Sequence, residues 1–209
     1  MSLIPVLFKL PLVLLPVHIA FLHLIIDPAC SIVFEAEPAE ANVMNRPPRN
    51  PHEPLFGRKT IGLAVLQGLG ILAIVLVIFV TALDSAKPTL RERGLGELDA
   101  RALTFTTLTL ANLGLIISER SSSRLSLKVL RSPNAALWWV VGGGLVFLVL
   151  VLYVPFLQQL FSFSYLHSFA ERLPWRIDLA ICLAGGAISL VWFECLKLWN
   201  KSAHGSIGQ

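Results

Sequence analysis

Apolar residues gather into long runs that are separated by shorter polar connectors. A helix needs about 20 apolar residues to cross a bilayer. Five runs are predicted to span, approximately at residues 14–34, 61–83, 101–118, 135–157 and 177–198. Residues 1–13 are too short and too rich in proline to span alone, and they predict the end of a partial helix followed by a tight turn at Lys9-Leu10-Pro11. The predicted fold is all-α: residues 1–209 form a single transmembrane domain, a bundle of about five full helices plus a partial N-terminal one.

The runs differ in polarity. Residues 61–83 and 135–157 carry no charge. Three glycines in the first of these are predicted to be points of close helix packing: Gly62, Gly68 and Gly70. The run at 101–118 is less apolar and contains several threonines and Asn112. Trp138, Trp139 and Tyr153 stand near the two ends of their run, as aromatic residues at a membrane interface do.

The distribution of Lys and Arg predicts the orientation of the chain. The connectors 35–60 and 119–134 and the C-terminal tail carry more Lys and Arg than the connectors on the opposite side. Positive residues favour the cytoplasmic side. We therefore expect these two connectors and the C-terminus in the cytoplasm, and a bacterial plasma membrane as the location.

Composition supports an integral membrane protein. Of the 209 residues 55% are hydrophobic and only 14% are charged, whereas soluble domains carry about 25% charged residues. The net charge of +4 does not indicate nucleic acid, because the basic residues lie in connectors and form no patch interleaved with aromatics. The bilayer is the expected partner. Cys30, Cys182 and Cys195 lie in apolar runs and predict no disulfide framework, and the last two are expected to be buried.

The N-terminus has a second interpretation as a signal peptide, because residues 2–26 are apolar with a single Lys9. Three features argue against it. The charge lies within the run, prolines interrupt the run, and Asp27 occupies a position where a signal peptide would carry an aliphatic residue.

The first spanning run carries the strongest candidate site. His23, Asp27 and Ser31 recur at i, i+4 and i+8 and so share one face of the helix, with Cys30 close by. Pro28 has no N–H, which predicts an unwound helix near Asp27-Pro28 and a freed carbonyl at Leu24. Ionisable residues are costly inside a membrane and mark ion pathways. These features predict a cation transport site with Asp27 as its principal ligand.

The same residues have a structural interpretation. A proline kink, with Asp27 paired to another helix and His23 as a satisfied polar contact, requires no transport. Asn112 and Thr109 of the run 101–118 are the candidate partners, and Asn112 is preferred because threonines in membrane helices bond their own backbone. A mixture of His, Asp and Cys suits a transition metal or a proton relay better than calcium. Glu194 and Lys197 are expected to pair with each other or with headgroups.

The sequence VMNRPPRNP at 43–51, followed by EPL at 53–55, carries a resemblance that extends over nearly the whole chain. It is similar to a connector of the P-type cation-transporting ATPases, I-M-x-R-P-P-R-x-P with E-P-L, which follows the sixth membrane helix of that family. Upstream, the family has L-I-P-V-Q … N-L-x-T-D-G-x-P-A where this chain has Leu15-Pro16-Val17 and then Asp27. Downstream, Phe105, Arg120-Ser121 and the pair Glu194 and Lys197 match the eighth and tenth helices. The resemblance covers the C-terminal membrane region, from the end of the fifth helix to the tenth.

The resemblance implies roles for individual residues. Asp27 stands at the ion-coordinating aspartate, His23 at an asparagine ligand and Ile26 at a threonine ligand. Asn112 falls near a Gln or Glu that helps to bind the ion in the eighth helix, and Pro28 replaces a glycine. The implied metal ligands are Asp27, His23 and Asn112. Because two ligand positions differ, the resemblance does not determine whether calcium or another metal ion is the transported cation.

Three functions follow as hypotheses. The 209 residues contain none of the family's D-K-T-G-T motif, nucleotide-binding domain or P-E-G-L helix, so this chain alone should not hydrolyse ATP and contains no catalytic residue or cofactor site. The first hypothesis is the membrane part of a calcium-ATPase-like pump, partnered by an N-terminal catalytic half. The second is a structural or regulatory membrane protein that kept the fold and lost transport. A membrane-embedded hydrolase using His23 and Asp27 is the third.

Overall fold

The computed structural model describes residues 3–37, 57–84, 95–119, 134–163 and 175–205, and within these ranges every element is an α-helix. The helices are α1 (Leu3–Leu7), α2 (Pro16–Glu35), α3 (Arg58–Asp84), α5 (Leu95–Glu119), α7 (Ala135–Tyr153), α8 (Pro155–Leu160) and α10 (Trp175–Gly205). The predicted all-α bundle is confirmed. In the described residues, four helices are long and apolar enough to cross a membrane: α3, α5, α7 and α10.

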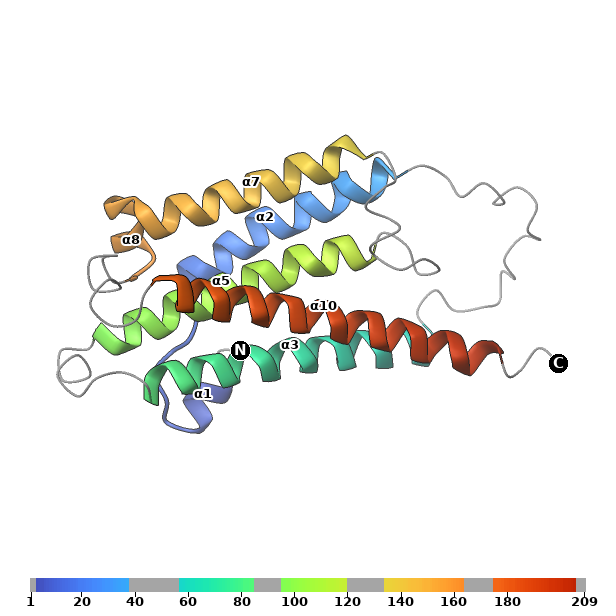
Figure 1. The fold of residues 1–209 in the computed structure, drawn as a ribbon, viewed down its shortest axis with the longest axis horizontal. Helices are drawn as coiled ribbons and strands as arrows, with labels where there is room; N and C mark the ends of the chain where they lie inside the picture. The colour runs from blue at the N-terminus through green and yellow to red at the C-terminus, as the bar shows by residue number, and fades with distance from the viewer. Residues whose placement is uncertain (1–2, 38–56, 85–94, 120–133, 164–174, 206–209) are drawn as a thin grey trace.

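Helix α5 lies at the centre of the bundle. It packs against α3 and α10 on one side and against α2 and α7 on the other (Figure 1). In its apolar window 78% of the residues are buried, against 22% in α3 and in α7. This explains why the run with the most threonines is stable: a helix covered by protein can carry polar groups, whereas helices that face lipid must be apolar.

The threonines of α5 bond to their own helix, as predicted. Thr104, Thr107 and Thr109 donate from their hydroxyls to the carbonyls four residues earlier, at 2.6, 2.9 and 2.9 Å. No hydroxyl in this group needs a partner from another helix. Thr109, one of the two partners considered for Asp27, is therefore already satisfied.

Helices α3, α5 and α10 approach one another closely at glycines. A Cβ added at Gly185 of α10 would lie 2.7 Å from Thr107 and 2.8 Å from Ile78, and one at Gly70 of α3 would overlap the indole of Trp192. Gly70 is thus a packing point, as predicted. The same prediction is wrong for Gly62 and Gly68, where nothing described lies within 4 Å of an added Cβ.

Helix α2 runs without interruption from Pro16 to Glu35, so the predicted unwinding near Asp27-Pro28 is wrong. Pro28 removes one hydrogen bond, to the carbonyl of Leu24, and the remaining bonds of the helix keep its backbone helical. Pro16 at the first helical position supplies a favourable start. The helix has 20 residues, and its role as a fifth membrane span stays a prediction.

The ends of several helices differ from the sequence-based boundaries. Helix α7 stops at Tyr153 rather than at residue 157, because Val154 before Pro155 adopts extended backbone and Pro155 starts the short helix α8. Helix α5 begins at Leu95, well before the predicted start at residue 101. The connector sequence RPPR at 46–49 lies outside the described residues.

Two short helices end in the same type of turn, and α1 ends where the turn was predicted. After α1, Leu10 N–H bonds to the Pro5 carbonyl at 2.8 Å, and Lys9 has a φ of 55°. After α8, Phe163 N–H bonds to the Gln158 carbonyl at 2.8 Å, and Ser162 has a φ of 52°. This is the Schellman arrangement, in which a left-handed residue reverses the chain.

None of the three cysteines forms a disulfide. Cys182 is buried, as expected, and its thiol points toward the Leu103 carbonyl at 3.6 Å. Cys195 was also expected to be buried, and this is wrong: it lies on an exposed face of α10. A cysteine behaves as a small apolar residue, which a helix facing lipid accommodates as well as a core does.

Candidate functional site

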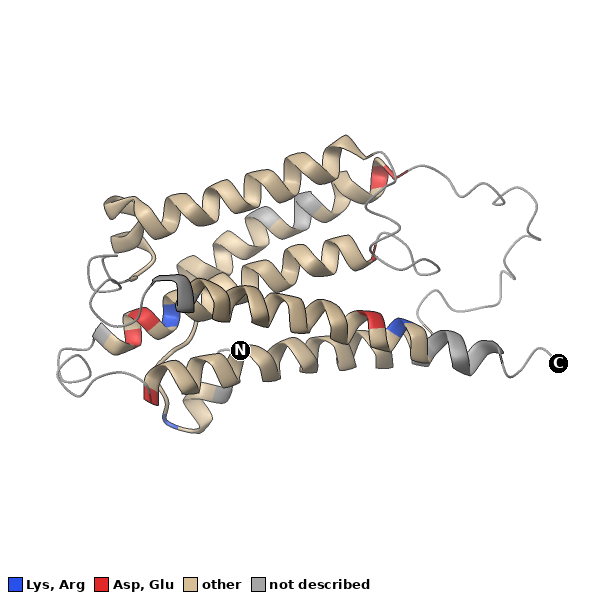
Figure 2. Ribbon diagram, in the orientation of Figure 1, with Lys and Arg blue, Asp and Glu red and all other residues tan. Residues whose placement is uncertain are grey.

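Charged side chains keep to the two ends of the bundle. Figure 2 shows Lys, Arg, Asp and Glu at both ends of the described helices, with the long middle section free of them. Beside the candidate site on α2, the groove between α2 and α5 has the carboxylate of Glu119 in its lining, at the end of α5. Any charge there would have to be matched by uncharged polar groups or by a bound ion.

The structure describes Asp27 only in part. Its backbone lies in α2, one turn after His23 and one turn before Ser31, while its side chain lies outside what is described. His23 and Ser31 are both exposed on α2. The two described members of the predicted face are therefore not buried against α5 or α7.

Asn112 faces a groove between α2 and α5. The groove has a volume of about 360 Å³ and is lined by Ile26, Cys30, Phe34, Asn112, Leu115, Ile116 and Glu119. Ile26 is the residue directly before Asp27. A second, narrower pocket shares Ile26, Asn112 and Ile116 and continues toward Gly144 of α7. The amide of Asn112 makes no hydrogen bond to any residue that the structure describes.

The predicted ligands are only partly brought together. Asn112 and Cys30 line the same groove, whereas His23 is exposed and does not line it. In the described part of the chain, no three His, Cys, Asp or Glu side chains gather as a metal site. The groove thus brings together Asn112 from α5 and Cys30 from α2.

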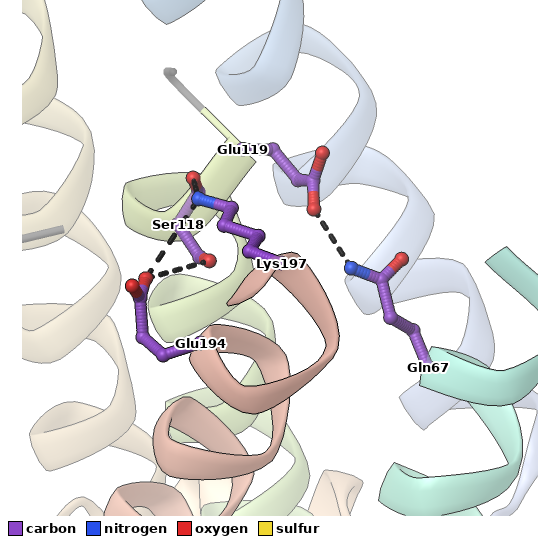
Figure 3. A network of polar contacts seen from close by, with 5 residues as sticks. All are labelled: Gln67, Ser118, Glu119, Glu194 and Lys197. Atoms are coloured by element: carbon purple, nitrogen blue, oxygen red, sulfur yellow. Dashed lines mark hydrogen bonds and ion pairs between the residues drawn. The ribbon is translucent and has the colours of Figure 1, made fainter. Parts of the chain in front are cut away.

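Glu194 and Lys197 belong to a polar network at the far end of α5 (Figure 3). Their side chains pair at 3.7 Å, and Lys197 also donates to the Ser118 carbonyl. The Ser118 hydroxyl donates to Glu194 at 3.3 Å, and Gln67 of α3 donates to Glu119 at 2.8 Å. A cation on the last carbonyls of a helix is favourable. The predicted pairing of Glu194 and Lys197 within α10 is confirmed. The bonds of both residues to Ser118 connect the end of α5 to α10.

Sequence reasoning missed a buried group at the opposite end. His18 is fully buried among phenylalanines, and its Nε2 lies 2.8 Å from the Phe161 carbonyl. Arg101, only 8% exposed, donates to the carbonyls of Leu12 and Ser162. The site predicted from the sequence centred on the helix face of His23, Asp27 and Ser31, which does not include His18. The signal available in the sequence was its place in the first turn of a helix, where a side chain meets free backbone groups.

Comparisons with known proteins agree on one family. The family described as cation transporting ATPase, C-terminus, matches residues 11–199. A calcium-transporting ATPase of Bacillus subtilis (strain 168) is 29% identical over 157 residues, which is 74% of this chain and 16% of that protein. Calcium-transporting ATPase 1 of Yarrowia lipolytica (strain CLIB 122 / E 150) is 24% identical over 191 residues, 90% of this chain and 18% of that protein. The chain thus spans less than a fifth of the length of these relatives.

Proposed function

This chain belongs to the cation-transporting ATPase C-terminus family, and we propose that it supplies part of the ion-binding pathway of a cation pump. Asp27 is the principal ligand, through its carboxylate. Asn112 contributes its amide oxygen from α5, and His23 contributes a ring nitrogen from the turn of α2 before Asp27. No catalytic residue and no cofactor of the pump lie in this chain.

The observation that carries the proposal is the unsatisfied amide of Asn112. It lies in a groove beside Ile26, the neighbour of Asp27, and has no hydrogen-bond partner in the described residues. A polar group at membrane depth is costly unless something satisfies it. A cation held by Asp27 and Asn112 would satisfy the amide oxygen and would also neutralise the carboxylate.

The chemistry of the ligands narrows the transported ion. Carboxylate and amide oxygens suit a hard cation such as calcium, and both relatives are named calcium-transporting. An imidazole in the ligand set favours a transition metal instead. Calcium is therefore the first cation to test, and manganese and zinc follow.

ATP hydrolysis belongs to another part of the pump. Both relatives are several times longer than this chain, so the proposed partner is the N-terminal catalytic part of a P-type ATPase, on the same polypeptide or on a second one. The excess of Lys and Arg in the connectors supports a cytoplasmic C-terminus, and the proposed location is a bacterial plasma membrane.

The test is cation uptake into membrane vesicles that contain the complete pump. Asp27→Asn keeps the shape of the side chain and removes its charge, and should lower uptake at least about tenfold, as loss of roughly 1.4 kcal/mol or more of ion binding would. Asp84→Asn is the matched control, because Asp84 is exposed at the end of α3, and uptake should not change. Unchanged uptake in Asp27→Asn would contradict the proposal and favour a structural or regulatory membrane protein.

A further inference from the structure

The end of the bundle where α2 and α5 begin holds His18 in an aromatic cage. The imidazole stacks on Phe163 with ring centroids 5.2 Å apart and planes 9° apart, and it also contacts Phe105 and Phe161. The side chain of His18 is completely buried. A polar ring in such a position must have both nitrogens satisfied.

The two hydrogen bonds of His18 require one particular form of the ring. Nδ1 accepts from the Leu15 N–H at 2.9 Å, and Nε2 lies 2.8 Å from the Phe161 carbonyl, to which it must donate. Only a neutral imidazole with its hydrogen on Nε2 can do both. A protonated ring would point an N–H at the Leu15 N–H, and the bond that caps the start of α2 would be lost.

Arg101 holds the same two segments beside His18. Its Nε and Nη2 donate to the Leu12 carbonyl at 3.2 and 3.1 Å, and Nη1 donates to the Ser162 carbonyl at 3.4 Å. Ser162 is the residue directly after Phe161, and Leu12 lies just before α2. The segment before α2 and the turn after α8 are thus joined by two side chains that bond to backbone carbonyls.

The charges near His18 also favour its neutral form. On α5, Arg101 is the cation beside it, while Glu97 is exposed and Asp99 lies nearer the start of the helix. Helix α8 and the turn after it contain no ionisable side chain, and Tyr153 of α7 is exposed. On the segment before α2, Lys9 is exposed, and His23 is exposed further along α2.

We propose that His18 and Arg101 form an acid-sensitive clasp between the segment before α2 and the turn after α8. At neutral pH the uncharged His18 completes the clasp. Protonation from the aqueous phase at this end removes the Leu15 bond and places a second cation beside Arg101, and the clasp opens. Because the clasp is separate from the Asp27 face, it operates whether or not the proposed ion pathway is correct.

The first test compares thermal unfolding of the purified protein between about pH 7.5 and pH 5, the range over which imidazoles gain their charge. The unfolding midpoint of the unmodified protein should fall by about 4–8 °C over that range. His18→Gln should remove the fall, because a glutamine can accept from Leu15 and donate to Phe161 without titrating. His23→Gln should keep it. A fall of equal size in His18→Gln would overturn the proposal.

A second measurement does not depend on His18→Gln folding. Spin labels at Leu12→Cys and Leu160→Cys, with the native cysteines replaced by serine, report the distance across the clasp. Both leucine side chains are exposed, at 42% and 51%. The distance distribution should broaden and lengthen at about pH 4 relative to about pH 7.5, because a buried imidazole gains its charge only in more acidic solution than an exposed one. An identical distribution at the two pH values would contradict an acid-sensitive clasp.

Discussion

The two sides of α5 are built in different ways. Toward α3 and α10 the helix packs through glycines, and an added Cβ at Gly185 or Gly114 would approach a neighbouring side chain to 2.7 or 3.0 Å. Toward α2 it leaves a groove of about 360 Å³ beside Asn112. Close approach at small residues is what holds helices together in lipid, where no hydrophobic force drives them together.

This difference assigns the two sides of α5 separate roles: the side toward α3 and α10 holds the bundle together, and the side toward α2 carries the proposed transport site. The α3–α5–α10 side has the contacts of a scaffold, and Thr107, which lies against Gly185 of α10, bonds to its own helix. On the α2 side, Asn112 lines the groove and makes no hydrogen bond to a described residue, and His23 is exposed. Substitutions on the first side should act on stability, and those at the groove should act on cation binding.

The largest loss of stability should follow from Phe105→Ala. Phe105 is fully buried on α5 and contacts His18, Phe21, Phe161 and Phe163, so it joins α5 to α2 and to the turn after α8. Truncating a buried phenylalanine costs about 3–5 kcal/mol. Phe156→Ala is the control, because Phe156 is 72% exposed. Equal unfolding midpoints for the two variants in detergent would refute the central position of Phe105.

A smaller loss should follow from filling the glycine contact. Gly185→Leu forces a side chain against Thr107 and Ile78, and overpacking of this kind costs about 1–3 kcal/mol. Gly142→Leu adds the same side chain where nothing described lies within 4 Å. The unfolding midpoint should drop for the first and stay near the original value for the second. A similar drop in both would mean that the α5–α10 contact is not specially close.

The smallest loss should come from the junction of α2 and α7. The Asn134 side chain accepts from the Leu137 N–H at 3.0 Å and donates to the Val33 carbonyl at 3.1 Å. Asn134→Ala removes the helix cap and should cost about 1 kcal/mol. Asn134→Asp keeps the cap acceptor and loses the donor. Its stability toward unfolding should therefore lie between that of the unmodified protein and that of Asn134→Ala. A stability equal to that of Asn134→Ala would assign the whole effect to the bonds that the Asn134 amide donates to Val33 and Glu37.

The sequence predicted the helices well because long apolar runs leave few alternatives in a membrane. It also predicted that Thr109 would bond its own backbone, and that Glu194 and Lys197 would pair, because these are contacts within one helix. Helix ends were less accurate: the proline at 155 starts α8, a helix too short to leave a pattern.

Contacts between distant segments could not be predicted from the sequence. His18 and Phe161 lie 143 residues apart, and nothing local to either indicates that they meet. The prediction of an unwound α2 at Pro28 gave too much weight to one missing hydrogen bond. Gly68 and Gly70 look alike in sequence, and only the position of Trp192 distinguishes them.

The most direct test of the account is whether a cation occupies the groove between α2 and α5. Cys30 lines this groove beside Asn112, whereas Cys195 is exposed on α10 and serves as an internal control. The measurement is the rate at which a membrane-permeant maleimide labels each cysteine in the complete pump, with and without calcium, manganese or zinc. We expect one of these cations to slow labelling of Cys30 severalfold, to leave Cys195 unchanged, and to lose its effect in Asp27→Asn. If Cys30 reacts at the same rate with every cation, the groove does not belong to a cation pathway.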